Sequence, residues 1–127
     1  METIEKIEST QGRPMLNEGE KYAGVLLGKD GAPDQHIILL PGDSNDASWK
    51  KQTEWAKSVG GELPTRREHT LLFANLPEEF KRDVYWSGET HAADSSYAWY
   101  QDFDYGYQDD NYKDRELRAR AVRRVAI

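Results

Sequence analysis

Residues 116–125 read ELRARAVRRV, and this stretch decides the class of fold. Apolar side chains alternate with arginines as far as Ala121, which is the period of a strand with one buried face. The phase then breaks, because Val122 and Val125 cannot share a face by simple alternation. The pattern therefore predicts a half-buried strand with a bulge near Val122 or Arg123.

Further strands are expected upstream of this stretch. Residues 85–87 and 98–103 are rich in aromatic side chains, which favour strands. Residues 22–28 and 36–40 are two apolar runs on either side of Asp30-Gly31. An Asp-Gly pair between two such runs predicts a β-hairpin with a loop longer than the tightest turns.

Two helices are expected between these groups of strands. A helix over 48–59 is predicted to begin at Asp46 or Ser48 and to end at Gly60-Gly61. Thr65 followed by Glu68 forms a capping box, which predicts a second helix as far as residue 75.

A short helical turn is predicted over residues 77–81, with Phe80 turned inward. Among the aromatic residues, Trp86 and Trp99 are expected to be mostly buried in the sheets. We also expect an α+β fold in a single domain over residues 20–127, preceded by a flexible arm over residues 1–19. The chain has 127 residues and no cysteine, so packing alone must hold this domain together.

Four segments together resemble a known family: 60–68 (GGELPTRRE), 85–88 (YWSG), 98–99 (AW) and 116–124 (ELRARAVRR). The combination resembles the DUF1566 domain family of phages and prophages, within the C-type lectin-fold group, and covers roughly residues 45–125. The resemblance implies a C-type lectin-like fold with two helices packed on small antiparallel sheets. It also implies paired N- and C-terminal strands, a long irregular ligand-facing segment, and kinship with the variable proteins of diversity-generating retroelements.

Residues 100–114 form the candidate ligand-binding segment, because tyrosines among Asp and Asn supply rigid contact area beside adaptable polar groups. The candidate site residues are Tyr100, Asp102, Asp104, Tyr105, Tyr107, Asp109, Asp110, Asn111 and Tyr112. We expect five of them to be exposed on one face: Tyr105, Tyr107, Asp109, Asp110 and Tyr112. Five Asp and one Lys leave residues 102–114 with a net charge of −4, which favours a partner with basic groups. The alternative is a solvated polar loop that only links two strands.

No metal or cofactor is expected. Asp109, Asp110 and Asn111 offer the oxygen ligands that Ca²⁺ prefers, but the carboxamide triplets of lectin-type calcium sites are absent. The arginines of residues 115–124 are expected to pair with carboxylates such as Asp102 or Glu68 rather than with nucleic acid. The formal net charge of −6 supports this expectation, since nucleic-acid affinity depends on basic side chains.

An enzyme is not expected. His36, His69 and His91 have no metal-ligand or catalytic spacing, and cysteine chemistry is excluded. Residues 1–14 lack the features of a secretory signal, and no apolar run approaches a membrane span. Together with the resemblance to the DUF1566 family, which implies a phage-type protein, the sequence predicts a cytoplasmic or virion-associated binding module for a protein or cell-surface ligand. The alternative is a small acidic inhibitor of a host defence or DNA-processing protein.

Overall fold

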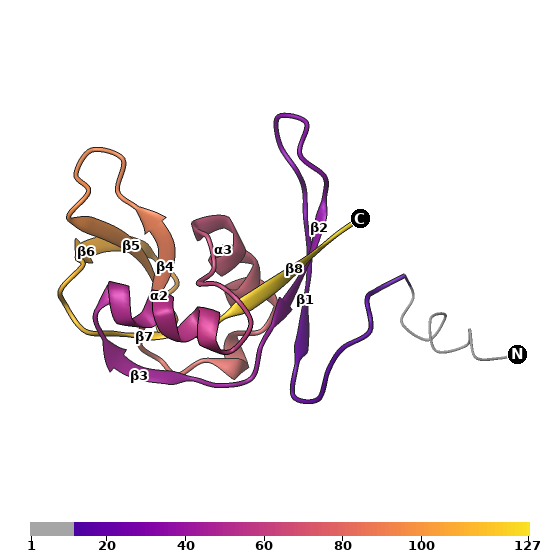
Figure 1. The fold of residues 1–127 in the computed structure, drawn as a ribbon, viewed down its shortest axis with the longest axis horizontal. Helices are drawn as coiled ribbons and strands as arrows, with labels where there is room; N and C mark the ends of the chain where they lie inside the picture. The colour runs from indigo at the N-terminus through magenta and orange to yellow at the C-terminus, as the bar shows by residue number, and fades with distance from the viewer. Residues whose placement is uncertain (1–11) are drawn as a thin grey trace, which may run out of the picture.

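The computed structural model describes residues 12–127, which form an α+β fold with two helices and two small sheets (Figure 1). Residues 1–11, and with them most of the predicted N-terminal arm, lie outside the described residues. Directly after the arm, Glu20 is buried and its carboxylate lies 2.9 Å from the Arg123 guanidinium. Within the described part of the arm, the Asn17 amide donates to the Glu20 carboxylate at 2.8 Å and the Met15 carbonyl accepts from Arg123 at 3.1 Å. These two hydrogen bonds attach the end of the arm to the domain.

The first sheet has three strands in the order β1-β2-β8. β1 (Lys21–Leu26) and β2 (Gln35–Leu39) form the predicted antiparallel hairpin. β8 (Val122–Ala126) pairs with β2. The expected pairing of the N- and C-terminal strands is therefore wrong in one respect, because the second strand takes the place of the first and β1 lies at the edge.

The second sheet has five strands in the order β3-β7-β4-β5-β6. These strands are β3 (Ser44–Ala47), β4 (Val84–Thr90), β5 (Tyr97–Asp102), β6 (Gln108–Tyr112) and β7 (Leu117–Ala119). The pairing of β4 with β7 is parallel, whereas the other neighbours run antiparallel. The strand predicted over 85–87 is confirmed as part of β4, and the strand predicted over 98–103 is confirmed as β5, which begins and ends one residue earlier.

The predicted final strand is two strands, one in each sheet, and the phase break is a crossing between sheets rather than a bulge. Arg120 and Ala121 make the crossing and both are buried. The Arg120 guanidinium donates to the Leu40 carbonyl at 2.9 Å and to the Glu79 carbonyl at 2.5 Å. Val122 thus turns to a different sheet from Ala119, which explains why one alternation cannot describe both.

Both predicted helices are confirmed. α2 (Trp49–Ser58) begins at Ser48, whose hydroxyl accepts from the amide of Lys51 at 3.3 Å. α3 (Arg66–Asn75) has the full capping box between Thr65 and Glu68. The short turn after α3 is the 3₁₀ helix η1 (Pro77–Glu79). It places Phe80 inward, stacked on Phe103 with ring centroids 3.8 Å apart.

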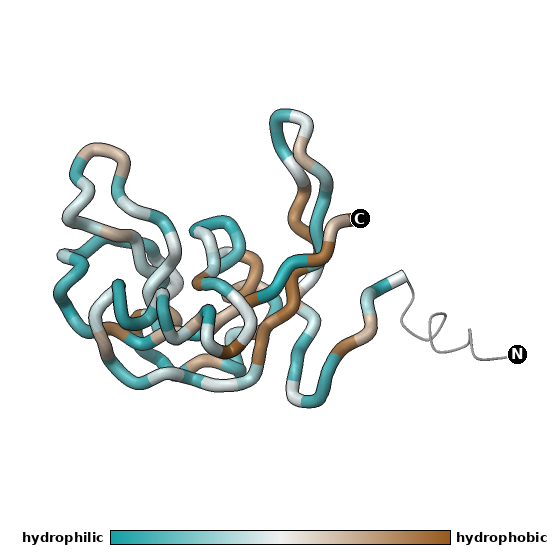
Figure 2. Tube along the Cα trace, viewed as in Figure 1, coloured by the Kyte–Doolittle hydropathy of each residue, from teal (hydrophilic) through white to brown (hydrophobic). Residues whose placement is uncertain are grey.

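Adjacent residues of β4 supply two separate cores, because successive side chains of a strand point to opposite faces. Tyr85 packs with Phe80, Phe103 and the apolar face of α3. Trp86 packs with Ala56 of α2 and with the apolar residues of β7. In Figure 2 the hydrophobic stretches gather along the three-stranded sheet, whereas β6 is mostly hydrophilic.

Candidate functional site

The candidate segment 100–114 is mainly a hairpin rather than the expected long irregular segment. Its first residues belong to β5, a turn follows, and residues 108–112 form β6 at the edge of the sheet. The Asp102 carboxylate stabilises the turn by accepting from the amide of Asp104 at 2.6 Å. Gly106 completes it with φ +93°, and a Cβ there would lie 2.7 Å from the Phe73 ring. The turn therefore requires glycine at this position.

The hairpin places the candidate residues on two faces. Side chains alternate along β6, so Asp110 and Tyr112 lie on the face that also carries Tyr97 and Trp99 of β5. Asp109 lies on the opposite face. The prediction of a single exposed face for the five residues is therefore wrong, because it treated a strand as a loop.

The first of these faces is the one that carries Tyr97, Trp99, Asp110 and Tyr112. The rings of Tyr112 and Tyr97 are paired with centroids 4.3 Å apart. Asp110 lies 3.7 Å from the His91 imidazole. A hollow of about 260 Å³ lies here, lined by His91, Asp94, Tyr97 and Asp110. Aromatic rings and carboxylates therefore lie side by side on this face.

Trp99 lies on this same face of the sheet and is partly buried, although it belongs to neither of the two cores. The Arg66 guanidinium stands 3.6 Å from its ring centroid, and the His91 ring is stacked on it at 5.0 Å. Arg66 is held in turn by Gln108, whose amide oxygen accepts from the guanidinium at 2.9 Å. Trp86 is fully buried, as predicted.

The opposite face carries Tyr100, Tyr107 and Asp109. Burial raises the pKa of Tyr100 to about 12, with smaller contributions from Tyr107 and Asp109. A hydrogen bond to the Asp102 carboxylate raises the pKa of Tyr107. On the first face, the hydrogen bond with Tyr112 raises the pKa of Tyr97 to about 12. These three tyrosines are neutral at physiological pH and keep hydroxyl protons for donation.

Exposed aromatic side chains are confined to this hairpin. Tyr105 is 83% exposed, Tyr107 50% and Tyr112 47%. The other aromatic residues of the chain, including all four Trp and all three Phe, are buried or half-buried. The remaining candidate residues divide between exposed Asp104 and Asp109, half-buried Tyr100, Asp110 and Asn111, and buried Asp102.

Asp and Asn side chains also form hydrogen bonds with backbone amides at the outer edge of β6. The Asp109 carboxylate accepts from the amide of Asp110 at 2.8 Å, and the Asn111 side-chain oxygen accepts from the amide of Tyr112 at 2.8 Å. The backbone groups of Asp109 and Asn111 point toward β5. This follows from the antiparallel register, because the ladder bonds on either side join Lys113 to Ser96 and Asp102 to Tyr107, and the direction alternates along the strand. The outward amides of Asp110 and Tyr112 are therefore satisfied internally, which disfavours the addition of another strand.

Three of the four arginines of residues 116–125 form ion pairs with distant carboxylates: Arg118 with Asp43, Arg123 with Glu20, and Arg124 with Glu62 and Glu68. The predicted pairing with Glu68 is confirmed. Asp102 does not pair with an arginine in residues 12–127, because its carboxylate holds the turn. The arginines thus link segments of the fold.

Sequence reasoning missed Tyr97, His91 and Arg66 as neighbours of the candidate residues. The sequence feature that could have identified Tyr97 is its spacing of two residues from Trp99, which places both side chains on one face of β5. Once β6 is recognised as a strand, Asp110 and Tyr112 fall on that same face. In residues 12–127, no group of three or more His, Asp or Glu side chains is arranged to hold a metal ion. Nor does this part of the chain contain a helix long and apolar enough to cross a bilayer.

No protein-family model matches the chain, and neither does any curated protein. The resemblance to the DUF1566 domain family therefore stays a prediction.

Proposed function

We propose that this protein is a non-enzymatic binding module that recognises a protein or cell-surface ligand through the β5–β6 hairpin. The observation that carries the proposal is the exposure of Tyr105, Tyr107 and Tyr112, in a chain whose other aromatic residues are at least half-buried. Tyrosine supplies large contact area at a low cost in side-chain entropy, and it is enriched among the residues that dominate binding energy.

The charges around the tyrosines favour a partner with basic groups. Asp104 and Asp109 are exposed, and Asp110 is half-buried beside the Tyr97–Tyr112 ring pair. Hydrogen bonds from Ser96 lower the pKa of the nearby Asp94, which keeps this carboxylate ionised at neutral pH. An ammonium or guanidinium group is attracted both to carboxylates and to aromatic faces.

The hydrogen bonds at the outer edge of β6 favour one mode of contact with a partner over another. Because the outward amides of Asp110 and Tyr112 are already satisfied, a partner strand gains little by pairing with them. Recognition through side chains on the two faces and the turn is therefore favoured over strand addition. As part of this proposal, we expect the protein to have a C-type lectin-like fold and to be a member of a phage-type family.

A second candidate function is inhibition of a host defence or DNA-processing protein. The net charge of −6 favours this function, because an acidic surface competes for the basic surfaces with which such proteins hold nucleic acid. Both functions use the same hairpin, and they differ in the partner.

Immobilised protein exposed to intact host cells and to host lysate tests the proposal and separates the two functions. The hairpin variant is Tyr105→Ser combined with Tyr107→Ser and Tyr112→Ser. Its matched control is Val25→Ser with Leu27→Ser, which removes exposed apolar side chains from the β1 end of the molecule. Partners retained by the wild type and by the control are expected to be lost from the hairpin variant. Each tyrosine should contribute about 1–3 kcal/mol of binding free energy.

Retention on intact cells supports surface recognition, and retention of a soluble nucleic-acid-binding protein supports inhibition. A partner that binds the hairpin variant and the wild type with equal affinity would exclude the hairpin as the site.

A further inference from the structure

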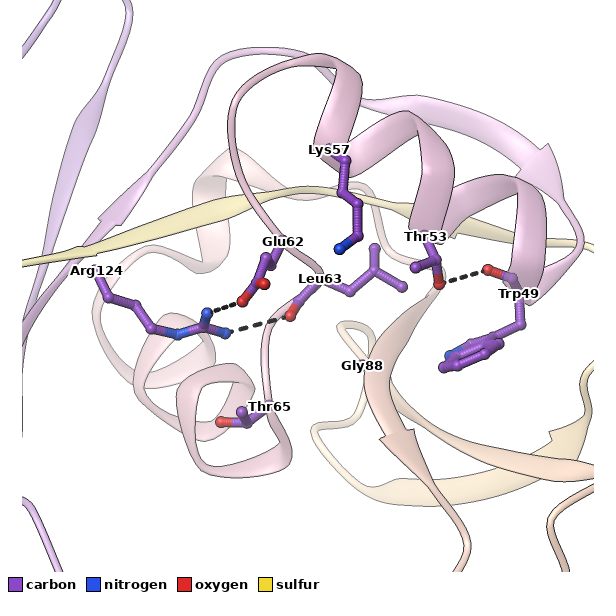
Figure 3. A pocket seen from close by; sticks show the side chains of 8 residues that line it. All are labelled: Trp49, Thr53, Lys57, Glu62, Leu63, Thr65, Gly88 and Arg124. Carbon is purple, nitrogen blue, oxygen red and sulfur yellow. Dashed lines mark hydrogen bonds and ion pairs between the residues drawn. The ribbon is translucent and has the colours of Figure 1, made fainter. Parts of the chain in front are cut away.

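A separate hollow of about 240 Å³ lies between α2 and the segment 62–65, away from the β5–β6 hairpin (Figure 3). One wall is the face of α2 that carries Trp49, Thr53 and Lys57. These residues are spaced four apart, so they share one face of the helix. In Figure 3 the Lys57 side chain extends from α2 toward Leu63, which brings its ammonium to the hollow.

The apolar part of the hollow is rigidly held. The Trp49 indole donates to the Ser87 carbonyl at 2.8 Å, which fixes the orientation of its ring. Opposite lie Leu63 and the backbone of Gly88, whose amide donates to the Pro64 carbonyl at 2.8 Å. A Cβ at residue 88 would approach the Leu63 carbonyl to 3.1 Å. A flat apolar group entering the hollow therefore meets preformed walls, as small-molecule sites require.

The charges beside the hollow leave one group uncompensated. Arg124 pairs with Glu62 and with the buried carboxylate of Glu68, so these three groups form a closed network. Within residues 12–127, Lys57 has no carboxylate within 4.0 Å. An anionic ligand group is therefore the complement of this site.

We propose that this hollow binds a small carboxylate with a flat apolar body, such as an aryl-substituted acetate. The carboxylate pairs with the Lys57 ammonium, and the ring packs between Trp49 and Leu63. The volume lies just below the range of ordinary ligand sites, which selects a compact molecule. No residue that lines the hollow belongs to segment 100–114, although the Lys113 ammonium of that segment stands 4.3 Å from the Trp49 ring centroid. None of the three exposed tyrosines takes part, so this inference can be tested apart from the proposed function.

Phenylacetate titrated into the ¹⁵N-labelled protein tests the inference, with phenylacetamide and 2-phenylethylamine as uncharged and cationic matches. Phenylacetate is expected to give saturable shifts of the Trp49 indole signal and of the Leu63 and Gly88 amides. Loss of the charged contact should weaken binding by about tenfold or more, so phenylacetamide should bind correspondingly less well. The cationic amine should give no saturable shift at these positions.

Lys57→Gln should weaken phenylacetate binding by the same factor. Lys50→Gln, on the same helix but outside the lining of the hollow, should leave binding unchanged. Thr53→Phe fills the hollow and should abolish the shifts while the remaining amide spectrum stays folded. The inference is overturned if phenylacetate gives no saturable shift, if phenylacetamide binds equally well, or if Lys57→Gln binds as the wild type does.

Discussion

At the scale of single residues, His69 is the most unusual side chain of the structure. It is fully buried on α3, with Nε2 3.1 Å from the Trp86 carbonyl oxygen and its ring edge-on to Phe103. Its Nδ1 has no hydrogen-bond partner in the described part of the chain. Burial lowers the pKa of His69 to about 4, so the imidazole is neutral in the folded state at physiological pH.

This burial predicts a stability that depends on pH. In the unfolded chain, His69 becomes protonated as the pH falls below its ordinary pKa of 6.5. In the folded protein, it becomes protonated only near pH 4. The free energy of unfolding should therefore fall as pH drops from about 6.5 to 4, by about 3 kcal/mol, and should level off below that range. Urea denaturation across this range measures the slope.

The variant His69→Leu should lose this part of the slope, whereas the half-buried His91→Gln should keep it. A pH dependence of His69→Leu identical to that of the wild type would contradict the assignment to this residue.

At the scale of elements, the sequence predicted those features that depend on residues close together in the chain. It did not predict features that depend on contacts between distant residues. The start of α3 was predictable because the Thr65–Glu68 box lies within one helical turn. β6 was not, because Asp and Asn disfavour strands in general and only pairing with β5 makes residues 108–112 extended. The crossing at Arg120 was visible as a phase break, but its destination depends on contacts with Leu40, 80 residues away.

The edge of β6 gives a prediction at this scale. Asp109→Ala with Asn111→Ala removes the side-chain acceptors from the outward amides of Asp110 and Tyr112. An edge with free amides is a template for pairing, so this variant should self-associate at lower concentration than the wild type. Light scattering against protein concentration measures the effect.

The matched control is Asp104→Ala with Asp114→Ala, which removes the same number of side chains, both outside β6. Because the control loses two negative charges and the edge variant only one, charge alone predicts the opposite order of association. Equal association of the two variants would show that the side-chain acceptors do not protect the edge.

At the scale of the whole molecule, Arg120 joins the two sheets. Its guanidinium is buried, donates to the carbonyls of Leu40 and Glu79, and stands 5.4 Å from the Phe80 ring centroid. No carboxylate in residues 12–127 lies within salt-bridge distance of it, and burial lowers its pKa. It serves the fold through hydrogen bonds and packing.

Arg120→Ala should leave the Leu40 and Glu79 carbonyls unsatisfied and should create a cavity. Its free energy of unfolding should be lower by about 3 kcal/mol than that of the wild type, as measured by urea denaturation. Arg115→Ala, at an exposed position before β7, should cost less than about 0.5 kcal/mol. Similar stability of the two variants would exclude the proposed role of Arg120.

The crossing between sheets also bears on how the protein is made. Residues 117–119 supply a strand to one sheet and residues 122–126 supply a strand to the other. On the ribosome, β1, β2 and β4 emerge well before the strands that complete their sheets. Neither sheet reaches its full strand order until this segment is synthesised, so the nascent chain exposes both apolar cores until then. A ribosome stall or a premature stop codon before residue 117 would leave a product with two incomplete sheets, which is a natural substrate for chaperones and proteases.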